Sequence, residues 1–353
     1  MKRSDKIIYQ YGNLAGWPYF YAKGLSDLGE KSISVKPVEN DFVKDDGTMA
    51  RRNLPTHKSV CRASDNRLKR LIKKLIFFLR NRNRIRLIHY HSTTMLPGFF
   101  DIIYFKLMKI PMIITWGGGD ARIIGIAREK NPYFYLEPDE KRDKETINKL
   151  RFISKYVKNV AADPELSEYS RLFFDKIYIL RQPIDLKKIL LNIPQRNLDC
   201  PRLLHIPTYQ NCKGTKYILE AVERLKKEGY NFDFRLMEAD LTQKQTRKRI
   251  SECDIYVDEL RVGSYGMTAV EAMASGKVVI TYIRDDLVNE YPEGLPVVNS
   301  NPDTVYNNLK NLLEKPELIS EIGKKSREYA ERYHDTKVVC SQLIDIYKEI
   351  GMK

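Results

Sequence analysis

The feature that most constrains this chain is the alternation of short apolar segments with helical patterns, a plan that occurs twice. In the first half we predict strands over residues 6–11, 32–38, 86–91, 111–116, 157–162 and 176–180. In the second half we predict them over 202–207, 232–237, 253–258, 278–283 and 295–300. Apolar, β-branched strands separated by helices are typical of a parallel sheet buried on both faces. The sequence therefore predicts an α/β protein with two doubly wound, Rossmann-like halves that face a cleft.

A chain of 353 residues is longer than one hydrophobic core ordinarily serves. Pro183 ends the last strand pattern of the first half, so we predict a first domain over 1–183, a linker over 184–200 and a second domain over 201–338. An amphipathic helix over 339–353 follows, for which packing back onto the first domain stays open. We find no apolar run of about eighteen residues and no signal-peptide pattern at the N-terminus. Five scattered cysteines without a C-x-x-C pair favour a reducing cytoplasm.

Ligands of doubly wound sheets bind beyond the carboxyl ends of the strands, so the residues after each strand are the site candidates. Gly12 and Gly16 follow the first strand, where backbone N–H groups either cradle a phosphate or form an ordinary turn. His89 and His91 lie on one side of the third strand. No third metal ligand accompanies them, and structural histidines are the main alternative.

The strand that ends at Trp116 leads into the segment GGGDAR, which includes Gly118 and Asp120. Three glycines let the backbone pass close to a ligand. Asp120 either caps the next helix or binds a sugar hydroxyl in the cleft. Both interpretations stay open.

In the second half, Lys213 lies just before Gly214 and the start of a helix. A cation next to a helix N-terminus is favourable if an anion lies between them. A lysine on the solvated surface is the alternative.

The segment VGSYGMTAVEAMASGK lies between two predicted strands. Gly263 and Gly266 favour a tight turn before a short helix with unpaired N–H groups at its start. Thr268 and Glu271 have the spacing of a capping box, which would make the acid structural. Alternatively, Glu271 accepts hydrogen bonds from the two hydroxyls of a ribose. In that interpretation the turn, Lys213 and Glu271 together bind a nucleoside diphosphate.

With these segments in place, the chain resembles glycosyltransferases of the GT-B fold, and more narrowly the family-4 enzymes that use nucleotide sugars. SYGMTAVEAMASGKVVI is similar to the family's EGFG-x4-EAMA-x-GKPVV segment, and PTYQNCKGTKYILEA is similar to its KG-x3-L-x-A helix. LRQPIDLKKI resembles the family's PNPID strand, and IITWGGGDAR resembles its TVHGSD turn. The resemblance spans nearly all of the chain and is stronger in the second half.

Three departures from the family pattern concern the site. The first of the family's two glutamates is matched by Gly263, and the histidine of VHGSD is matched by Gly117. No arginine partner of Lys213 is evident, and Gln210 or Asn211 lies nearby instead. The missing glutamate leaves the donor sugar and the choice between retention and inversion open. Asp258 and Glu259 are candidates to replace it.

The resemblance implies transfer of a sugar from a nucleotide diphosphate-sugar to a saccharide or lipid-linked saccharide, with retention, in cell-envelope polysaccharide synthesis. We expect no cofactor beyond the donor and no metal, since no DxD motif is present. The catalytic candidates are Lys213, Glu271 and Asp120. The donor-binding candidates are Gly12, Gly16, Thr208, Lys213, Glu259, Ser264, Tyr265, Gly266, Met267, Thr268 and Glu271. The acceptor-side candidates are His91, Trp116 and Gly118. A nucleotide-sugar-binding protein without catalysis and a sugar-nucleotide epimerase are the alternatives.

The positive charge of the chain is concentrated in one segment. Of the formal net charge of +15, residues 51–86 contribute +12, with thirteen Lys or Arg and one acid, so the remainder carries +3. Residues 67–80 form an amphipathic helix pattern that either packs on the sheet or docks on anionic lipid. No RNA-binding motif accompanies this charge, so we expect no nucleic-acid partner. We expect a cytoplasmic protein, with an anionic membrane surface that contacts 67–86 as a further partner.

Overall fold

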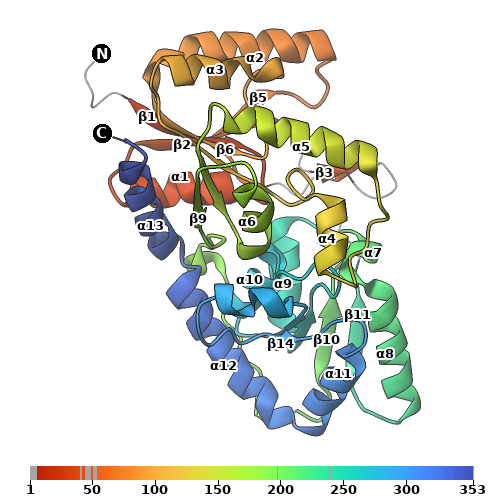
Figure 1. Cartoon of the computed structure of the whole chain (residues 1–353). Helices are drawn as coiled ribbons and strands as arrows, with labels where there is room; N and C mark the ends of the chain where they lie inside the picture. Colours follow the sequence, from red (N-terminus) through yellow and green to blue (C-terminus); the bar gives the residue numbers. More distant parts are fainter. Residues whose placement is uncertain are drawn as a thin grey trace.

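A computed structural model describes residues 6–39, 42–43, 49–50, 54–196, 198–237 and 241–352. Two parallel sheets with helices on their faces form the two halves of the chain (Figure 1), which confirms the predicted α/β fold class. Arg51 and Arg52 of the basic segment lie outside the described residues.

The first sheet has the order β5-β2-β1-β6-β7-β8-β9, and all its described pairings are parallel. Its strands are β1 (Ile7–Gly12), β2 (Ser32–Val38), β5 (Lys58–Cys61), β6 (Ile85–His91), β7 (Met112–Thr115), β8 (Asn159–Ala162) and β9 (Lys176–Ile179). The sequence did not predict β5, a four-residue edge strand inside the basic segment. Two short strands, β3 (Phe42–Val43) and β4 (Met49–Ala50), pair with each other in the antiparallel sense.

Helices cover both faces of the first sheet, because parallel strands of this kind are apolar on both sides. The helices of the first half are α1 (Trp17–Asp27), α2 (Arg67–Asn81), α3 (Phe100–Leu107), α4 (Ile124–Lys130), α5 (Glu140–Ser154) and α6 (Pro164–Arg171). Two 3₁₀ turns, η2 (Arg82–Arg84) and η3 (Pro97–Phe99), join them to the sheet. Residues of α2, α3, α5 and α6 share one apolar core, and α1 belongs to another on the opposite face.

The second sheet has the order β11-β10-β12-β13-β14 and is also parallel. Its strands are β10 (Arg202–His205), β11 (Asp233–Leu236), β12 (Ile255–Val257), β13 (Val278–Thr281) and β14 (Val298–Asn299). Its helices are α7 (Gln210–Lys213), α8 (Thr215–Lys227), α9 (Gln243–Glu252), α10 (Met267–Ala274), α11 (Val305–Glu314) and α12 (Pro316–Tyr333), with 3₁₀ turns η4 (Leu186–Lys188) and η5 (Asp285–Glu290). The first sheet ends at Ile179 and the second begins at Arg202.

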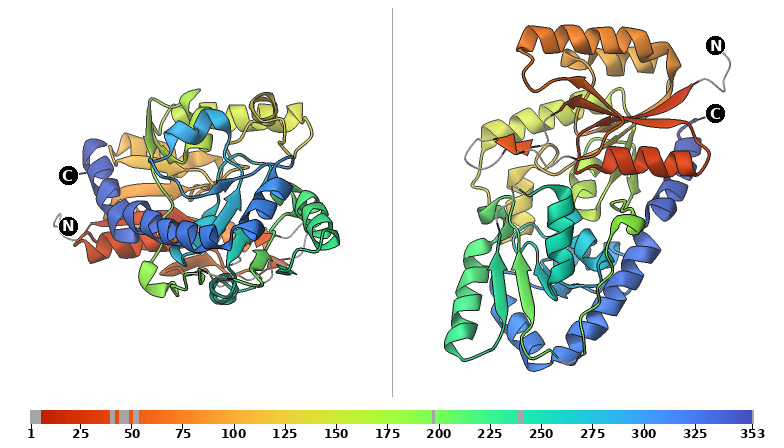
Figure 2. Two further views of the ribbon diagram at one scale, coloured as in Figure 1. Left: turned by 90° about the horizontal axis from the view of Figure 1, so that it is seen from below. Right: turned by 180° about the vertical axis from the view of Figure 1, so that it is seen from behind.

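The C-terminal helix α13 (Thr336–Glu349) crosses from the second half to the first (Figure 2). Val339, Cys340 and Leu343 pack with α1 against the first sheet. The hydroxyl of Tyr347 lies 2.8 Å from both Gln10 Nε2 and His89 Nδ1, which belong to β1 and β6. The last helix of the chain therefore completes the first half.

The helix α2 does pack on the first half, as one of the two sequence alternatives held, but not through its apolar stripe, whose six residues face solvent. The helix instead packs through Phe77 and Phe78. Among the described residues, no helix combines the length and the apolar character that crossing a bilayer requires.

Candidate active site

The loop after β10 brings Lys213 to the carboxyl edge of the second sheet. Gly214 follows in the left-handed region at φ 73°, so the chain turns tightly from α7 into α8. The Lys213 ammonium nitrogen lies 2.7 Å from a carboxylate oxygen of Asp258 and 3.1 Å from one of Glu259. Burial by itself would lower the pKa of Lys213, but the two carboxylates outweigh burial and raise that pKa well above its usual value. Lys213 is therefore a permanent cation in the interior of the site.

The glycine-bracketed turn before α10 lies against this lysine. Gly263 adopts φ 91°, and a Cβ at this position would come within 2.5 Å of the Arg284 side chain. Gly266 is the N-cap of α10, and its N–H donates to Asp258 over 3.4 Å. A Cβ on Gly266 would lie 3.8 Å from the Lys213 ammonium nitrogen. The lysine and the start of α10 are thus neighbours, an arrangement suited to binding an anion.

The capping box predicted around Glu271 does not form. Gly266, not Thr268, is the N-cap of α10, so Glu271 lies beyond the first turn of the helix. Its buried carboxylate accepts hydrogen bonds from Arg247 Nε at 2.8 Å and Gln243 Nε2 at 3.4 Å. Both donors belong to α9, so Glu271 joins two helices of the second half.

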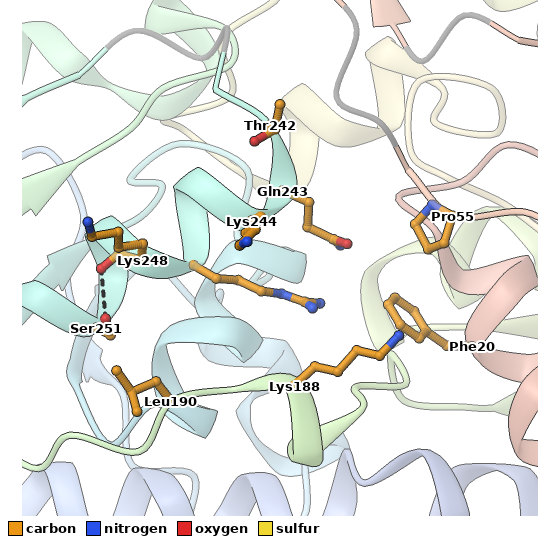
Figure 3. A pocket seen from close by; sticks show the side chains of 10 residues that line it. Phe20, Pro55, Lys188, Leu190, Thr242, Gln243, Lys244, Lys248 and Ser251 are labelled. Atoms are coloured by element: carbon orange, nitrogen blue, oxygen red, sulfur yellow. Dashed lines mark hydrogen bonds between the residues drawn. The ribbon is translucent and has the colours of Figure 1, made fainter.

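A cavity of about 680 Å³, lined by both of these donors, lies between the two halves of the chain (Figure 3). Phe20 and Pro55 line it from the first half, opposite Gln243 of α9. The charged residues that line it are all basic: Lys188, Lys244, Arg247 and Lys248. The Arg247 Nη2 atom is buried and has no hydrogen-bond partner among the described residues. The cavity therefore combines apolar walls with donors for an oxygen-rich ligand.

Direct contacts join the two halves next to the turn. Asn131 donates to the carbonyl oxygens of Arg261 and Val262 at 2.9 and 3.1 Å. In return, Arg261 Nε donates to the carbonyl oxygen of Tyr133 at 2.8 Å. The segment after α4 is therefore fixed beside the loop that follows β12.

The two glycines after β1 lie where a side chain would clash or where the backbone makes a left-handed turn. Gly12 has φ 144°, and a Cβ on it would lie 2.1 Å from the carbonyl oxygen of His91. Gly16 has φ 82° and is the N-cap of α1, without a side-chain cap. The structure accounts for both glycines by packing and turn geometry, and their role in phosphate binding stays a prediction.

Two of the acceptor-side candidates are interior residues. His91 is fully buried, stacks on His89 with ring centroids 4.1 Å apart, and is hydrogen-bonded to Gln10 at 2.9 Å. Burial, followed by the neighbouring His89, holds the pKa of His91 well below its usual value. Trp116 is 2% exposed and belongs to the core of the first half. Neither side chain is accessible to an acceptor in this arrangement, because β6 and β7 are covered on both faces.

The segment GGGDAR forms a closed turn. The Asp120 carboxylate accepts hydrogen bonds from the N–H groups of Gly117 and Gly118 at 2.9 and 2.8 Å. It does not cap the next helix, because the N-cap of α4 is Ile123. Asp120 thus stabilises its own turn, and binding of a sugar hydroxyl by the same carboxylate stays a prediction.

The side chains of two further donor candidates are hydrogen-bonded to other side chains of the chain. The Ser264 hydroxyl lies 2.9 Å from that of Tyr291, and the Tyr265 hydroxyl lies 3.0 Å from His334 Nε2. Both side chains are buried in the second half. Three further candidates are half-buried, at the loop after β10 and the first turn of α10: Thr208, Met267 and Thr268.

Sequence reasoning missed Arg247 and Gln243 of α9 and Asn131 of the first half. The T-x-x-Q pattern at 242–245 does form a capping box and marks the start of α9. Nothing local indicates that the same helix faces Glu271, because the contact depends on the packing of α9 against α10.

Glu259 gives the site a pH dependence near neutrality. Burial raises the pKa of Glu259 to about 7, and Lys213 opposes this shift only in part. Below that pH the carboxyl is neutral, and above it a second negative charge faces Lys213. We expect the affinity for a nucleoside diphosphate, measured by titration calorimetry, to fall about tenfold between about pH 6 and about pH 8. The Glu259→Gln variant should show a flatter profile, and a wild-type profile in this variant would refute the assignment.

The geometry of two facing, doubly wound halves is that of the GT-B fold. A sucrose-phosphate synthase from Thermosynechococcus elongatus superimposes with a TM-score of 0.64, is 14% identical, and covers 98% of this chain and 99% of its own. HepE from Anabaena, solved in complex with UDP and glucose, has a TM-score of 0.61 at 10% identity, covering 98% and 100%. WaaG, a glycosyltransferase involved in lipopolysaccharide biosynthesis, has a TM-score of 0.59 at 11% identity, covering 96% and 98%.

Sequence comparison points to the same class. Residues 239–329, which include the turn and Glu271, match the family model of glycosyl transferases group 1. An uncharacterized glycosyltransferase from Methanocaldococcus jannaschii is 24% identical over 289 residues, which are 76% of each chain. The predicted resemblance to GT-B glycosyltransferases is therefore confirmed. Among the described residues, no group of three His, Cys, Asp or Glu side chains is placed to hold a metal ion.

Proposed function

We propose that the chain transfers a hexosyl or related sugar from a nucleotide diphosphate-sugar to a saccharide or lipid-linked saccharide. The observation that carries this proposal is the position of Lys213 beside the start of α10, the helix whose Glu271 is hydrogen-bonded to Arg247 in the wall of the cavity. The lysine and the helix N–H groups suit a diphosphate. The UDP complexes of HepE, which shares the fold, support a nucleoside diphosphate as the ligand.

The mechanism follows from where negative charge develops. When the bond between the sugar and the diphosphate breaks, the departing oxygen gains charge, which Lys213 and the N–H groups of α10 stabilise. The Asp258 and Glu259 carboxylates hold the lysine in position before the donor binds. Glu271 accepts hydrogen bonds from ribose hydroxyls, in exchange for part of its contact with Arg247. The two halves orient donor and acceptor and exclude water.

We extend the proposal to a retaining transfer in which the departing diphosphate takes the acceptor proton, so that no protein base is required. We propose that the acceptor is a substrate of cell-envelope polysaccharide synthesis and that the chain binds it at the cytoplasmic face of the cell membrane. The similarity of fold to WaaG, named for lipopolysaccharide biosynthesis, supports this choice of pathway class.

The test is release of nucleoside diphosphate from a panel of UDP-, GDP- and ADP-sugars, with and without a lipid extract as acceptor. We expect release from one donor class and a faster rate with the extract. A protein that binds a nucleotide sugar without releasing diphosphate is the non-catalytic alternative. Conversion of the donor to its epimer without any acceptor would identify an epimerase instead.

A further inference from the structure

The outer side of α2 carries a contiguous apolar stripe, which we call the α2 stripe. Its six side chains are between 42 and 66% exposed: Leu68, Leu71, Ile72, Leu75, Ile76 and Leu79. Their spacing of three and four residues places them on one side of the helix. Single exposed leucines are common on protein surfaces, but a contiguous apolar stripe marks an interaction surface.

The orientation of α2 is fixed by contacts on its opposite side. Phe77 and Phe78 enter the core, and Phe78 packs edge-on against Phe105 with ring centroids 5.7 Å apart. Lys73 pairs with the buried Asp65 at 2.5 Å, and Arg70 donates to a backbone carbonyl at 2.7 Å. The helix thus turns Arg70 and Lys73 toward the protein and its leucines toward solvent, whereas an ordinary surface helix buries its leucines.

The edges of the α2 stripe are positively charged. At 3.6 residues per turn, Arg67 borders the stripe on one side, and Lys69 and Arg80 border it on the other. All three side chains are exposed, and α2 contains no acidic residue, although the Lys69 ammonium nitrogen also lies 3.4 Å from a carboxylate oxygen of Asp65. An apolar centre with basic edges is complementary to a bilayer that has anionic headgroups above its acyl chains.

This charge pattern favours a bilayer over the other partners that could cover this side of α2. Two copies of the chain joined by a two-fold axis through the α2 stripe would bring the same basic edges together, and like charges repel. A nucleic acid would satisfy the cations and leave six apolar side chains in water. An anionic lipid surface satisfies both features at once.

We propose that α2 lies flat on an anionic phospholipid bilayer, with the α2 stripe at the acyl boundary and Arg67, Lys69 and Arg80 at the level of the phosphates. This proposal rests on the proposed function in one respect: a lipid-linked acceptor lies in the membrane surface that α2 contacts. The binding itself does not depend on transferase chemistry and is tested without it.

The experiment is flotation of the full chain with vesicles of phosphatidylcholine, alone or mixed with phosphatidylglycerol. We expect binding only to the anionic mixture, weakened by salt. Leu71→Ser/Leu75→Ser should lower the vesicle affinity about tenfold or more. Arg67→Gln/Arg80→Gln should lower it about 30-fold, because each cation near an anionic surface contributes about 1 kcal/mol.

The matched control is Leu172→Ser/Leu219→Ser. It removes two exposed leucines outside α2, one at the C-terminal end of α6 and one in α8. This control should bind vesicles like the wild type. Equal binding to neutral and anionic vesicles, no binding to either, or equal losses in the control and in Leu71→Ser/Leu75→Ser would each overturn the proposal. Self-association that disappears in Leu71→Ser/Leu75→Ser, without flotation, would assign the stripe to a second copy of the chain instead.

Release of diphosphate from a soluble nucleotide sugar is measured on the same variants without vesicles. We expect wild-type rates, because α2 and the Lys213 site lie in different halves of the chain. Vesicle binding without any donor turnover would leave the docking surface intact and refute the proposed function alone.

Discussion

Lys213→Ala is expected to lower the rate of diphosphate release from the donor about 100- to 1000-fold. The lysine supplies a full positive charge where negative charge develops, and loss of one preorganised donor at such a position has an effect of this size. Its ammonium group is held 2.7 Å from Asp258, so it is already in place before the substrate arrives. The measurement is steady-state turnover at saturating nucleotide sugar.

Two controls distinguish the loss of the Lys213 charge from a loss of folding stability. Lys216→Ala removes an equal charge from the exposed surface of α8 and should leave turnover unchanged. Lys213→Ala also leaves two buried carboxylates without their cation, which destabilises the chain. We therefore repeat the substitution in a Glu259→Gln background, where only the Asp258 charge loses its partner. Wild-type turnover in Lys213→Ala would exclude the lysine from the mechanism.

Glu271→Ala is expected to give the second largest effect, a loss of about 100-fold in kcat/KM for the donor. Two hydrogen bonds from ribose hydroxyls to a buried carboxylate are lost together. At the lower end of the range for bonds to a charged group, about 1.5 kcal/mol each, the loss is roughly 100-fold, because part of the contact with Arg247 is given up when the bonds form. The loss should be seen mainly in KM, because the ribose contact is made equally in the ground state and the transition state. Donor titrations over a wide concentration range measure it.

The matched variant for Glu271 is Arg247→Met. Both substitutions break the same 2.8 Å ion pair, so both lower the melting temperature if the pair stabilises the second half. Only Glu271→Ala removes the carboxylate that the donor needs. A donor KM in Glu271→Ala equal to that of the wild type would show that Glu271 acts only as a structural partner of α9.

Local patterns in the sequence were sufficient to predict the apolar strands of both sheets and the turn before α10. The runs at 202–207 and 278–283 contain β10 and β13, because a buried parallel strand needs a continuous apolar segment and little else. Gly263 was predicted as a turn residue because it is a glycine next to Gly266, and its φ of 91° lies in a region that residues with a Cβ avoid. The edge strand β5 was not predicted, because this short strand lies in a basic segment and lacks a continuous apolar segment.

The partners of the site residues could not be predicted in this way. Asp258 and Glu259 were candidates by their position after β12, but their shared contact with Lys213 joins residues 45 and 46 positions apart. Glu271 was assigned either to a capping box or to a ribose; the capping box does not form, and the sequence did not indicate the ion pair with Arg247. Trp116 and His91 had positions suited to the cleft, yet their strands turn these side chains into the interior.

By itself, the sequence determined that the chain has two βα halves, a glycine turn before α10 and an amphipathic pattern in α2, because strand burial, turn conformation and helix periodicity depend on residues close in the chain. The tertiary structure alone decided which side of α2 faces water and which helix holds Glu271. Both outcomes depend on packing between segments far apart in sequence: Phe77 and Phe78 enter the core of the first half, while the α2 stripe stays exposed.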